Sequence, residues 1–402
     1  MSYEHLSDRV KNLNESATLE MTRKSRELKE AGKDVINLSI GEPDFNTPEC
    51  IKDAAIEAIN KNITHYPPVP GYKELRKAIS DKLKKDNGLD YSIDQIIVSG
   101  GAKQSIANAF LCLVNKGDEV LIPAPYWVSY PEMVKLAEGV PVILPTSIAN
   151  DFKVTPKQVK DAITAQTKVF IFSSPCNPSG SSYTRDELYE LAKVLAEKDD
   201  LYVISDEIYE LISFNGKHES IAQFDFIKDR VVTINGVSKN YAMTGWRIGY
   251  MAATKALAAA CNTLQGQYTS GAASISQMAA LKALQTDHNT LAEVQEMKQA
   301  FLERRNLVLR KLKEIPGIIS NVPNGAFYVF PDVSFYYGKS DGNTVIRDGN
   351  DLCLYLLDKT YVALVAGDAF GGYNHIRISY AASTRVLVRA LVRIKDGLSK
   401  LK

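Results

Sequence analysis

Two cationic side chains stand in a stretch of the sequence that is otherwise poor in charge. Lys239 and Arg247 lie in N-G-V-S-K-N-Y-A-M-T-G-W-R-I-G-Y, a segment rich in small and aromatic residues. A lysine in such surroundings tends to lose its proton, and a neutral amine is the nucleophile that attacks carbonyl compounds. A buried arginine at this place indicates a bound anion, either phosphate or carboxylate. Taken alone, the segment is also compatible with a surface lysine whose stem lies along apolar neighbours.

Other polar side chains follow short apolar runs, where strands are expected to end. Asp206 stands in S-D-E-I-Y-E directly after such a run. We expect its carboxylate to be half buried and to need a cationic partner, with Tyr209 one turn away. Asn177 precedes a proline in S-S-P-C-N-P-S-G and is therefore kept out of the α region. Taken singly, Asp206 is also compatible with a helix N-cap and Asn177 with an ordinary loop.

A glycine turn and a strand arginine extend this set. S-G-G-A-K-Q-S follows the apolar run that ends at Val98 and opens a predicted helix. Its backbone N–H groups can hold a phosphate at the helix N-terminus, although an empty tight turn has the same sequence. The turn is not a dinucleotide fingerprint, which argues against a nucleotide-dependent dehydrogenase. Arg377, in I-R-I-S, indicates either carboxylate capture or a solvated strand face.

Together these residues meet the needs of one cofactor. Pyridoxal phosphate requires a lysine for a Schiff base, a cup for its phosphate, and an acid that keeps the ring nitrogen protonated. Lys239, the glycine turn and Asp206 supply these three parts. We therefore expect pyridoxal 5'-phosphate as the cofactor and no metal.

The elements that must position these residues follow an alternating pattern. Seven short, nearly unbroken apolar runs are typical of strands that are buried on both faces, namely 95–98, 120–122, 142–144, 169–172, 202–204, 231–234 and 248–252. Predicted helices lie between several of them, for example 103–114 and 186–198. This order predicts the α/β class, with a mainly parallel seven-stranded sheet in a large domain that binds the cofactor.

The two ends of the chain have a different pattern of predicted elements. A helix at 17–31 and a short strand at 35–40 precede the alternating region, and a long charged helix at 292–313 follows it. We expect a smaller α+β domain built from both chain ends. The predicted division is 1–47 for the N-terminal arm and part of the small domain, 48–290 for the large domain, and 291–402 for the rest of the small domain.

Composition limits the class of partner. The 402 residues include 48 Lys and Arg against 47 Asp and Glu, a formal net charge of +1. This balance gives no electrostatic case for a nucleic acid or an anionic membrane, so the substrate is expected to be small. Five cysteines and five histidines are scattered without zinc spacing. The N-terminus lacks the apolar core of a secretory signal, and we expect a reduced, cytoplasmic location.

Eight ordered motifs resemble the fold-type I, class I aminotransferases, most closely the bacterial Ib-type aspartate aminotransferases. They are N-L-S-I-G-E-P-D-F-N-T-P, Y-P-P-V-P-G-Y-K-E-L-R, V-S-G-G-A-K-Q, P-A-P-Y-W-V-S-Y-P-E-M, S-S-P-C-N-P-S-G, S-D-E-I-Y-E, S-K-N-Y-A-M-T-G-W-R-I-G-Y and H-I-R-I-S-Y-A. The resemblance runs from the N-terminal helix almost to the C-terminus.

The resemblance implies a role for each matched residue. Lys239 would carry the cofactor and move a proton, and Asp206 would pair with the ring nitrogen. The remaining cofactor contacts would come from Asn177 and Tyr209 at the ring oxygen, Trp127 on the ring face, and Gly101, Ala102, Lys103, Arg247 and a neighbouring subunit's Tyr66 at the phosphate. Substrate would be held by Arg377, Asn177, Trp127 and Gly41 at the α-carboxylate, and by Lys103, Ser16 and Thr18 at a distal carboxylate.

The resemblance also implies an activity. It is the reversible transfer of an amino group from L-aspartate to 2-oxoglutarate in a homodimer, with the N-terminal helix closing over substrate. Prephenate, aromatic or other amino acid substrates, or a β-lyase reaction, stay open as alternatives. An amino-acid sensor is disfavoured because the chain has no spare length for a DNA-binding module. Two departures stand out: Gly236 replaces a serine that some relatives use for phosphate, and Cys176 replaces a more usual Asn or His.

Overall fold

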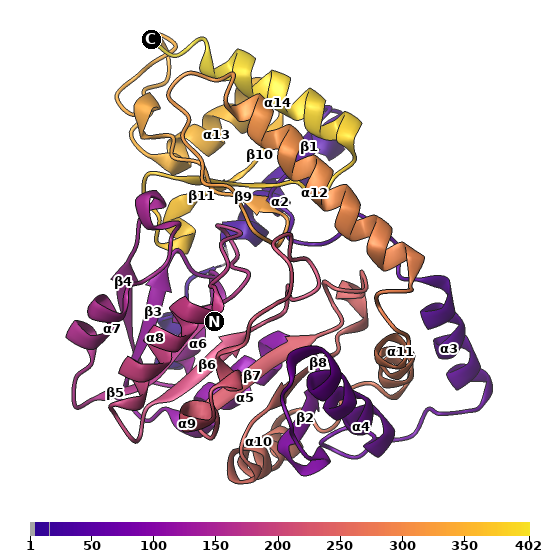
Figure 1. Cartoon of the computed structure of the whole chain (residues 1–402). Coiled ribbons are helices and arrows are strands. Elements are labelled where there is room, and N and C mark those ends of the chain that lie inside the picture. The colour runs from indigo at the N-terminus through magenta and orange to yellow at the C-terminus, as the bar shows by residue number, and fades with distance from the viewer. Residues whose placement is uncertain (1–4, 16) are drawn as a thin grey trace.

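A seven-stranded sheet is the centre of the larger part of the chain in the computed structural model, which describes residues 5–15 and 17–402 (Figure 1). Its strands, in spatial order, are β2 (Ile96–Ser99), β8 (Gly249–Ala252), β7 (Val231–Gly236), β6 (Tyr202–Asp206), β5 (Thr167–Ser173), β3 (Glu119–Ala124) and β4 (Val140–Pro145). All neighbouring pairs from β7 to β4 are parallel, and β8 is antiparallel to both of its neighbours. The predicted α/β class and all seven predicted strands are confirmed.

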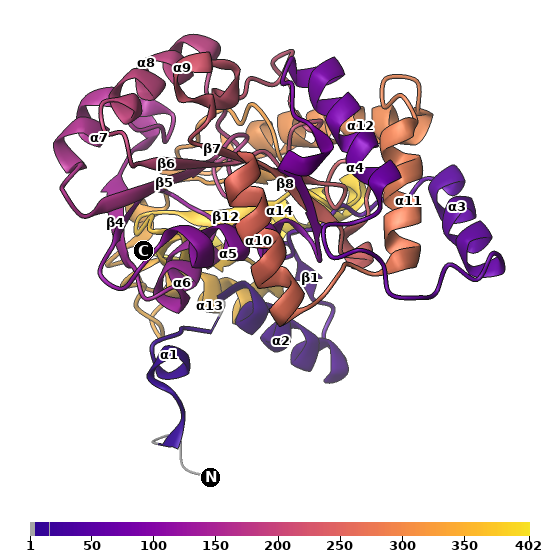
Figure 2. The ribbon, with the colours of Figure 1, turned by 90° about the horizontal axis from the view of Figure 1, so that it is seen from below.

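Helices cover both faces of this sheet, which is why β2, β7 and β8 consist entirely of buried residues. One face packs against α5 (Ala102–Leu113), α6 (Ser129–Leu136) and α10 (Lys255–Tyr268), which Figure 2 shows together. The core on the other face contains residues of α3 (Glu49–Asn60), α4 (Lys73–Lys82), α7 (Pro156–Ala162), α8 (Arg185–Ala196), α9 (Asp225–Lys228) and α11 (Ser274–Gln285). Two apolar layers therefore enclose the strands and fix the positions of their ends.

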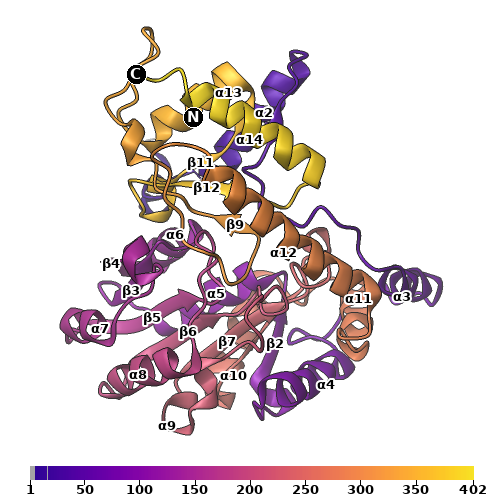
Figure 3. The same ribbon diagram turned by 45° about the horizontal axis from the view of Figure 1, so that its top comes forward.

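Residues 17–37 meet the C-terminal part of the chain in a smaller lobe, in the upper part of Figures 1 and 3. β1 (Ile36–Asn37) pairs in parallel with β10 (Val362–Ala363), and an antiparallel sheet has the order β11 (Val365–Ala366), β12 (Ile376–Ser379), β9 (Tyr328–Val329). The helices of the chain ends are α1 (Asp8–Lys11), α2 (Ala17–Glu30), α12 (Ala292–Leu312), α13 (Gly349–Thr360) and α14 (Thr384–Leu398). The pairing of β1 with β10 ties the N-terminal arm to the C-terminal region, while the predicted domain limits stay a prediction.

The predicted N-terminal strand at 35–40 is shorter in the structure. Only Ile36–Asn37 pair as a strand, because the side-chain Oδ1 of Asn37 accepts the Ser39 N–H at 2.9 Å. The Leu38 N–H still donates to the Ala363 carbonyl at 2.9 Å, so the hydrogen bonds to β10 end after Leu38, and the Ser39 N–H is satisfied locally by Asn37. None of the helices within residues 5–15 and 17–402 is both long enough and apolar enough to span a membrane.

Candidate active site

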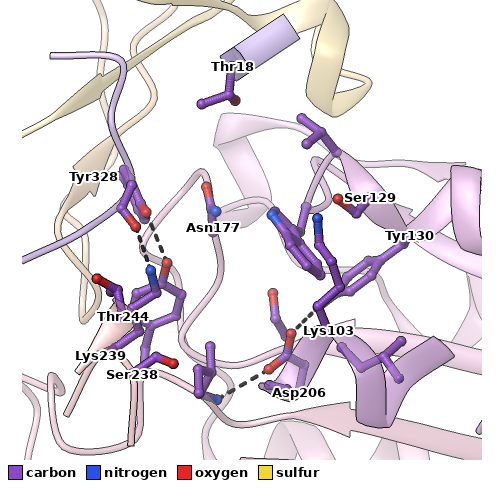
Figure 4. Close-up of a pocket in the computed structure, with 18 of the residues that line it drawn as sticks. Thr18, Lys103, Ser129, Tyr130, Asn177, Asp206, Ser238, Lys239, Thr244 and Tyr328 are labelled. Carbon is purple, nitrogen blue, oxygen red and sulfur yellow. Dashed lines mark hydrogen bonds between the residues drawn. The ribbon is translucent and has the colours of Figure 1, made fainter. Parts of the chain in front are cut away.

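A cavity of about 300 Å³ opens where β6 and β7 end, and residues of both lobes line it (Figure 4). Most of the predicted site residues lie on its wall, namely Thr18, Gly41, Ala102, Lys103, Trp127, Asn177, Asp206, Tyr209, Lys239, Arg247 and Arg377. Parallel strands bring their carboxyl ends to one edge of a sheet, so residues far apart in the sequence meet here.

Lys239 follows β7 by three residues and projects into the cavity (Figure 4). Its Nζ donates a hydrogen bond to the carbonyl of Gly41. The pKa of Lys239 is lowered to about 8, mainly by burial; Glu42 and Asp206 oppose this shift, and Arg377 and Arg247 contribute to it. A substantial fraction of this amine is therefore neutral, and nucleophilic, near pH 8.

Asp206, the last residue of β6, faces the same cavity but is more deeply buried than the sequence predicts, with 5% of its surface exposed. Tyr130 Oη donates to its Oδ2 at 2.6 Å and the Ile208 N–H to its Oδ1 at 3.3 Å. Burial raises the pKa of Asp206 to about 6 despite these two bonds. Within the described part of the chain it forms no ion pair, so its expected cationic partner must come from a ligand.

Arg377 is an almost fully buried cation, with 2% of its surface exposed. Its Nη1 donates to Asn177 Oδ1 at 3.0 Å and its Nη2 to the carbonyl of Ser39. No hydrogen-bond partner lies at Nε, and no described acid forms an ion pair with the guanidinium. The solvated strand face that the I-R-I-S pattern left open is thus excluded. A buried, uncompensated guanidinium that lines a cavity is suited to a carboxylate.

Arg247 differs from the expectation of a buried arginine, because its side chain is exposed in this chain. Nη1 donates to the carbonyl of Thr244 at 2.9 Å and Nη2 to that of Gly100 at 3.2 Å. The guanidinium fills the space beside Gly101, where an added Cβ would lie 2.2 Å from Nη2. Gly101 also has a φ of +98°, so the turn needs glycine for both space and conformation.

Lys103 and Trp127 lie together on another wall of the cavity. The ammonium of Lys103 is 4.8 Å from the centroid of the Trp127 ring, within cation–π range. Partial burial, with a smaller effect of Arg247, lowers the pKa of Lys103. Thr18, near the start of α2, contributes to the same cavity from the N-terminal arm (Figure 4).

Within the described residues, two predicted site residues, Gly101 and Tyr66, do not line this cavity. Tyr66 is 95% exposed and does not line the pocket of its own chain. Its expected contact belongs to a second subunit and stays a prediction. Ser16 lies outside the described residues.

The structure adds two tyrosines that the sequence reasoning missed. Tyr130 holds Asp206, and Tyr328 Oη lies 2.9 Å from Tyr209 Oη. Tyr209 is in a turn, not in the helical turn expected after Asp206. Both missed residues lie in motifs rich in aromatic residues, P-A-P-Y-W-V-S-Y-P-E-M and G-A-F-Y-V-F. The aromatic residues of these two motifs were the only signal in the sequence that could have pointed to Tyr130 and Tyr328.

Gly236, one of the two departures, has a packing reason. A Cβ at this position would lie 2.9 Å from Gly249 Cα and 2.9 Å from the Ile248 carbonyl oxygen. A serine does not fit unless β7 and β8 separate. The other departure, Cys176, is buried and lies 3.5 Å from the carbonyl oxygen of Pro125, consistent with a packing role.

A second group of buried charges adjoins the same strand ends. We call Lys82, Glu207, Glu210 and His218 the back cluster; Glu207 directly follows Asp206 in the chain. Lys82 and Glu210 form an ion pair, and His218 Nε2 lies 3.0 Å from Glu207 Oε2. None of these four side chains lines the cavity of about 300 Å³.

Comparison with known proteins identifies the family. Residues 33–394 match the family model described as aminotransferase class I and II. The chain belongs to this family. Its members are pyridoxal-phosphate-dependent transaminases, which act on amino and 2-oxo acids.

Individual relatives match over nearly the whole chain. The chain is 50% identical to the bifunctional aspartate aminotransferase and glutamate/aspartate-prephenate aminotransferase of Petunia hybrida, covering 99% of this chain and 83% of the relative. It is 44% identical to the aspartate aminotransferase of Bacillus subtilis, covering 98% and 99%. The crystal structure of the Rhizobium meliloti aspartate aminotransferase superposes with a TM-score of 0.95 at 39% identity, covering 99% and 100%.

The residues of this cavity fit the aminotransferase cofactor. Lys239 offers an amine with a lowered pKa, and Asp206 is a buried carboxylate that forms no ion pair within the described residues. Gly101 and Arg247 form a positively charged turn with no room for another side chain. These three features correspond to a Schiff base, a protonated ring nitrogen and a phosphate.

Proposed function

We propose that this aminotransferase moves an amino group from L-aspartate to 2-oxoglutarate, giving oxaloacetate and L-glutamate by a ping-pong route. Support comes from relatives that carry the name aspartate aminotransferase over 98–99% of this chain. The observation that carries the proposal is the pair of cations on one cavity, Arg377 and Lys103, neither of which forms an ion pair within the described residues. A dicarboxylate substrate needs two cations.

Each cation is proposed to hold one end of the substrate. Arg377 binds the α-carboxylate through its guanidinium, assisted by Asn177, Trp127 and the backbone of Gly41. Lys103 binds the distal carboxylate, with Thr18 and Ser16 as further donors. The pKa of Lys103 lies below its ordinary value but is not shifted by any acid, so the ammonium is available to a ligand.

The proposed chemistry divides between two residues at the strand ends. When bound, pyridoxal phosphate supplies an electron-withdrawing ring that stabilises the carbanion formed at the substrate Cα. Lys239 would take the Cα proton as a neutral amine and would then hold it at Nζ for the return transfer. Asp206 keeps the ring nitrogen protonated, because a buried carboxylate gains most from a nearby positive charge.

The remaining residues are proposed to orient the cofactor. Arg247 and the backbone N–H groups of Gly101, Ala102 and Lys103 bind the phosphate at the N-terminus of α5. Trp127 would contact the cofactor ring, and Asn177 and Tyr209 would hydrogen-bond its oxygen. Tyr328 keeps Tyr209 in place, since their hydroxyl oxygens lie 2.9 Å apart.

A half-reaction titration tests this proposal. The protein loaded with pyridoxal phosphate is mixed with aspartate, glutamate, alanine or phenylalanine, and the cofactor absorbance and the products are followed. We expect conversion to pyridoxamine phosphate with release of the matching 2-oxo acid, at the highest kcat/KM for aspartate and glutamate. Ammonia with pyruvate would indicate a β-lyase instead, and equal efficiency for all four donors would contradict the dicarboxylate assignment.

Prephenate is a second candidate amino acceptor. The relatives from Petunia hybrida and Rhizobium leguminosarum, the latter 47% identical over 97% of this chain, carry prephenate in their names. Prephenate is itself a 2-oxo acid with a second carboxylate, so the same pair of cations would suit it. Amino transfer from glutamate to prephenate, measured by loss of prephenate, decides whether it is used.

We also propose a cytoplasmic homodimer in which Tyr66 completes the neighbouring phosphate site. The five cysteines are all free thiols, which supports a reducing compartment. The 95% exposure of Tyr66 supports a contact outside its own chain. Sedimentation gives the mass, and Tyr66→Phe is expected to weaken cofactor affinity while leaving a dimer. A monomer with full activity would contradict this assembly.

A further inference from the structure

Two of the five cysteines lie close together, away from the active site. Cys112 is on α5 and Cys261 is on α10, two helices that pack against each other on one face of the sheet (Figure 2). Their sulfur atoms are 3.7 Å apart, and Cys261 Sγ donates to Cys112 Sγ. Cys176, by contrast, lies 3.5 Å from a backbone carbonyl oxygen.

We propose that Cys112 and Cys261 form an oxidisable dithiol, which closes to an intramolecular disulfide on reaction with a small disulfide such as oxidised glutathione. The two thiols differ in access. Cys112 is partly exposed, whereas Cys261 has 0% of its surface exposed in the apolar layer between the sheet and α10. A reagent in solution therefore meets Cys112 first, and Cys261 completes the bond from inside.

The chemistry balances without any further reactant. The Cys112 thiolate attacks one sulfur of the small disulfide and expels one thiol, which leaves a mixed disulfide. The Cys261 thiolate then attacks the Cys112 sulfur and expels the second thiol. The two cysteines lose two electrons and two protons, and the small disulfide becomes two thiols. The hydrogen bond from Cys261 favours the thiolate at Cys112 and lowers its pKa, which supports this order.

Formation of this disulfide needs only a small movement of the two cysteine side chains. A disulfide has a sulfur–sulfur distance of about 2.05 Å, so the two side chains must approach by rotation and a slight shift of the helices. Cys112 is near the end of α5, whereas the cavity residues Ala102 and Lys103 are at its start, about 15 Å away at 1.5 Å per residue. The disulfide is therefore expected to brace α5 against α10 without disturbing turnover.

Thiol counting on the holoenzyme tests this proposal. After equilibration with oxidised glutathione and quenching in denaturant, the number of free thiols should fall from five to three. Peptide mapping should find one cross-link, between Cys112 and Cys261, that dithiothreitol reverses. The oxidised enzyme should have a higher Tm than the reduced one, because the cross-link restricts the unfolded chain, and an unchanged kcat.

Matched variants control for the other thiols. Cys112→Ser and Cys261→Ala should each lose the cross-link, while Cys353→Ser should still form it, leaving two of its four thiols free. Five free thiols in the oxidised protein would overturn the proposal. So would glutathione that stays on Cys112 beside a free Cys261, or a cross-link between other cysteines. These readouts do not depend on the amino acid substrate, so they fail or succeed independently of the proposed transamination.

Discussion

Near the ends of β6 and β7, some buried charges have charged partners among the described residues and others do not. In the back cluster, Glu210 accepts hydrogen bonds from Lys82, from Asn87 at 2.8 Å and from Asn235 at 2.6 Å. In the cavity, Arg377 contacts an amide oxygen and a backbone carbonyl. One region pairs its charges within the protein, and the other leaves them to be paired by a ligand.

The pKa values reflect this difference. Burial alone would raise the pKa of Glu210, but Lys82 and His218 bring it down to about 2, so this acid is ionised at every ordinary pH. Burial raises the pKa of Asp206 to about 6, with no full charge pair to oppose it. Two neighbouring acids of similar burial thus have different tasks. The back cluster stabilises the fold. The buried charges of the cavity are destabilising until cofactor and substrate bring opposite charges to them.

The largest effect is expected from Lys239→Ala. Proton transfer by a positioned group is worth ~10²–10⁴-fold, and loss of the covalent attachment adds to this. Turnover measured with aspartate and 2-oxoglutarate should therefore fall by roughly 10³-fold or more, which is the upper part of that range. Partial recovery with added methylamine would support the role of a free amine, and near-native activity without it would remove Lys239 from the mechanism.

The next largest effect concerns stability and separates the two regions directly. Glu210→Ala leaves Lys82 buried without its acid and should lower the free energy of unfolding by about 3–5 kcal/mol. Asp206→Asn should leave the apo protein at least as stable at pH 8. The pKa of Asp206 is raised to about 6 in the folded state, so its stabilising contribution is complete at pH values below the pKa of the unfolded state. That contribution is lost as the pH rises through about 6.

Urea denaturation of the cofactor-free proteins measures both changes. The same Asp206→Asn variant should lose roughly 10- to 150-fold in kcat, the equivalent of one charged hydrogen bond. If both substitutions destabilised the apo protein equally, the distinction between paired and unpaired charge would be wrong.

A smaller, selective effect is expected from Lys103→Ala. Loss of one charged hydrogen bond to a distal carboxylate costs ~1.5–3 kcal/mol in kcat/KM for aspartate and glutamate. Alanine and phenylalanine carry no distal charge and should change little. Measuring the four donors with wild-type and variant enzyme decides the matter, since a uniform loss would assign Lys103 to the cofactor or the fold.

The smallest effect is a pH dependence of stability in the back cluster. Burial and the repulsion from Lys82 both lower the pKa of His218. The attraction of Glu207 and Glu210 outweighs these two effects, so the pKa of His218 is raised above 6.5. The stabilisation is complete below the unfolded pKa of His218 and is lost as pH rises through the raised folded value. Thermal melts of the apo protein above pH 6.5 should therefore show a decline that His218→Asn flattens, and parallel profiles would contradict the ion pair.

Much of the architecture was predictable from local pattern. The seven apolar runs, the helix after the glycine turn and the long helix that begins at Ala292 all follow from periodicity and flanking glycines, because such elements depend on neighbours in the chain. The 35–40 strand was overestimated because its apolar pattern does not reveal that Asn37 would bond Ser39. The gathering of Lys239 and Asp206 was predicted from their positions after strand ends and from the needs of one cofactor, and the motif resemblance added the role of Arg377 at the same cavity.

The sequence by itself determined the order of the elements, the chemical types at the strand ends and the family to which the chain belongs. The tertiary structure alone decided which buried charges have partners. Tyr130 reaches Asp206 across 76 residues, and Arg377 reaches Asn177 across 200. The reason is physical: the state of a buried charge depends on every group within a few ångströms, and those groups come from strands that meet only when the sheet is assembled.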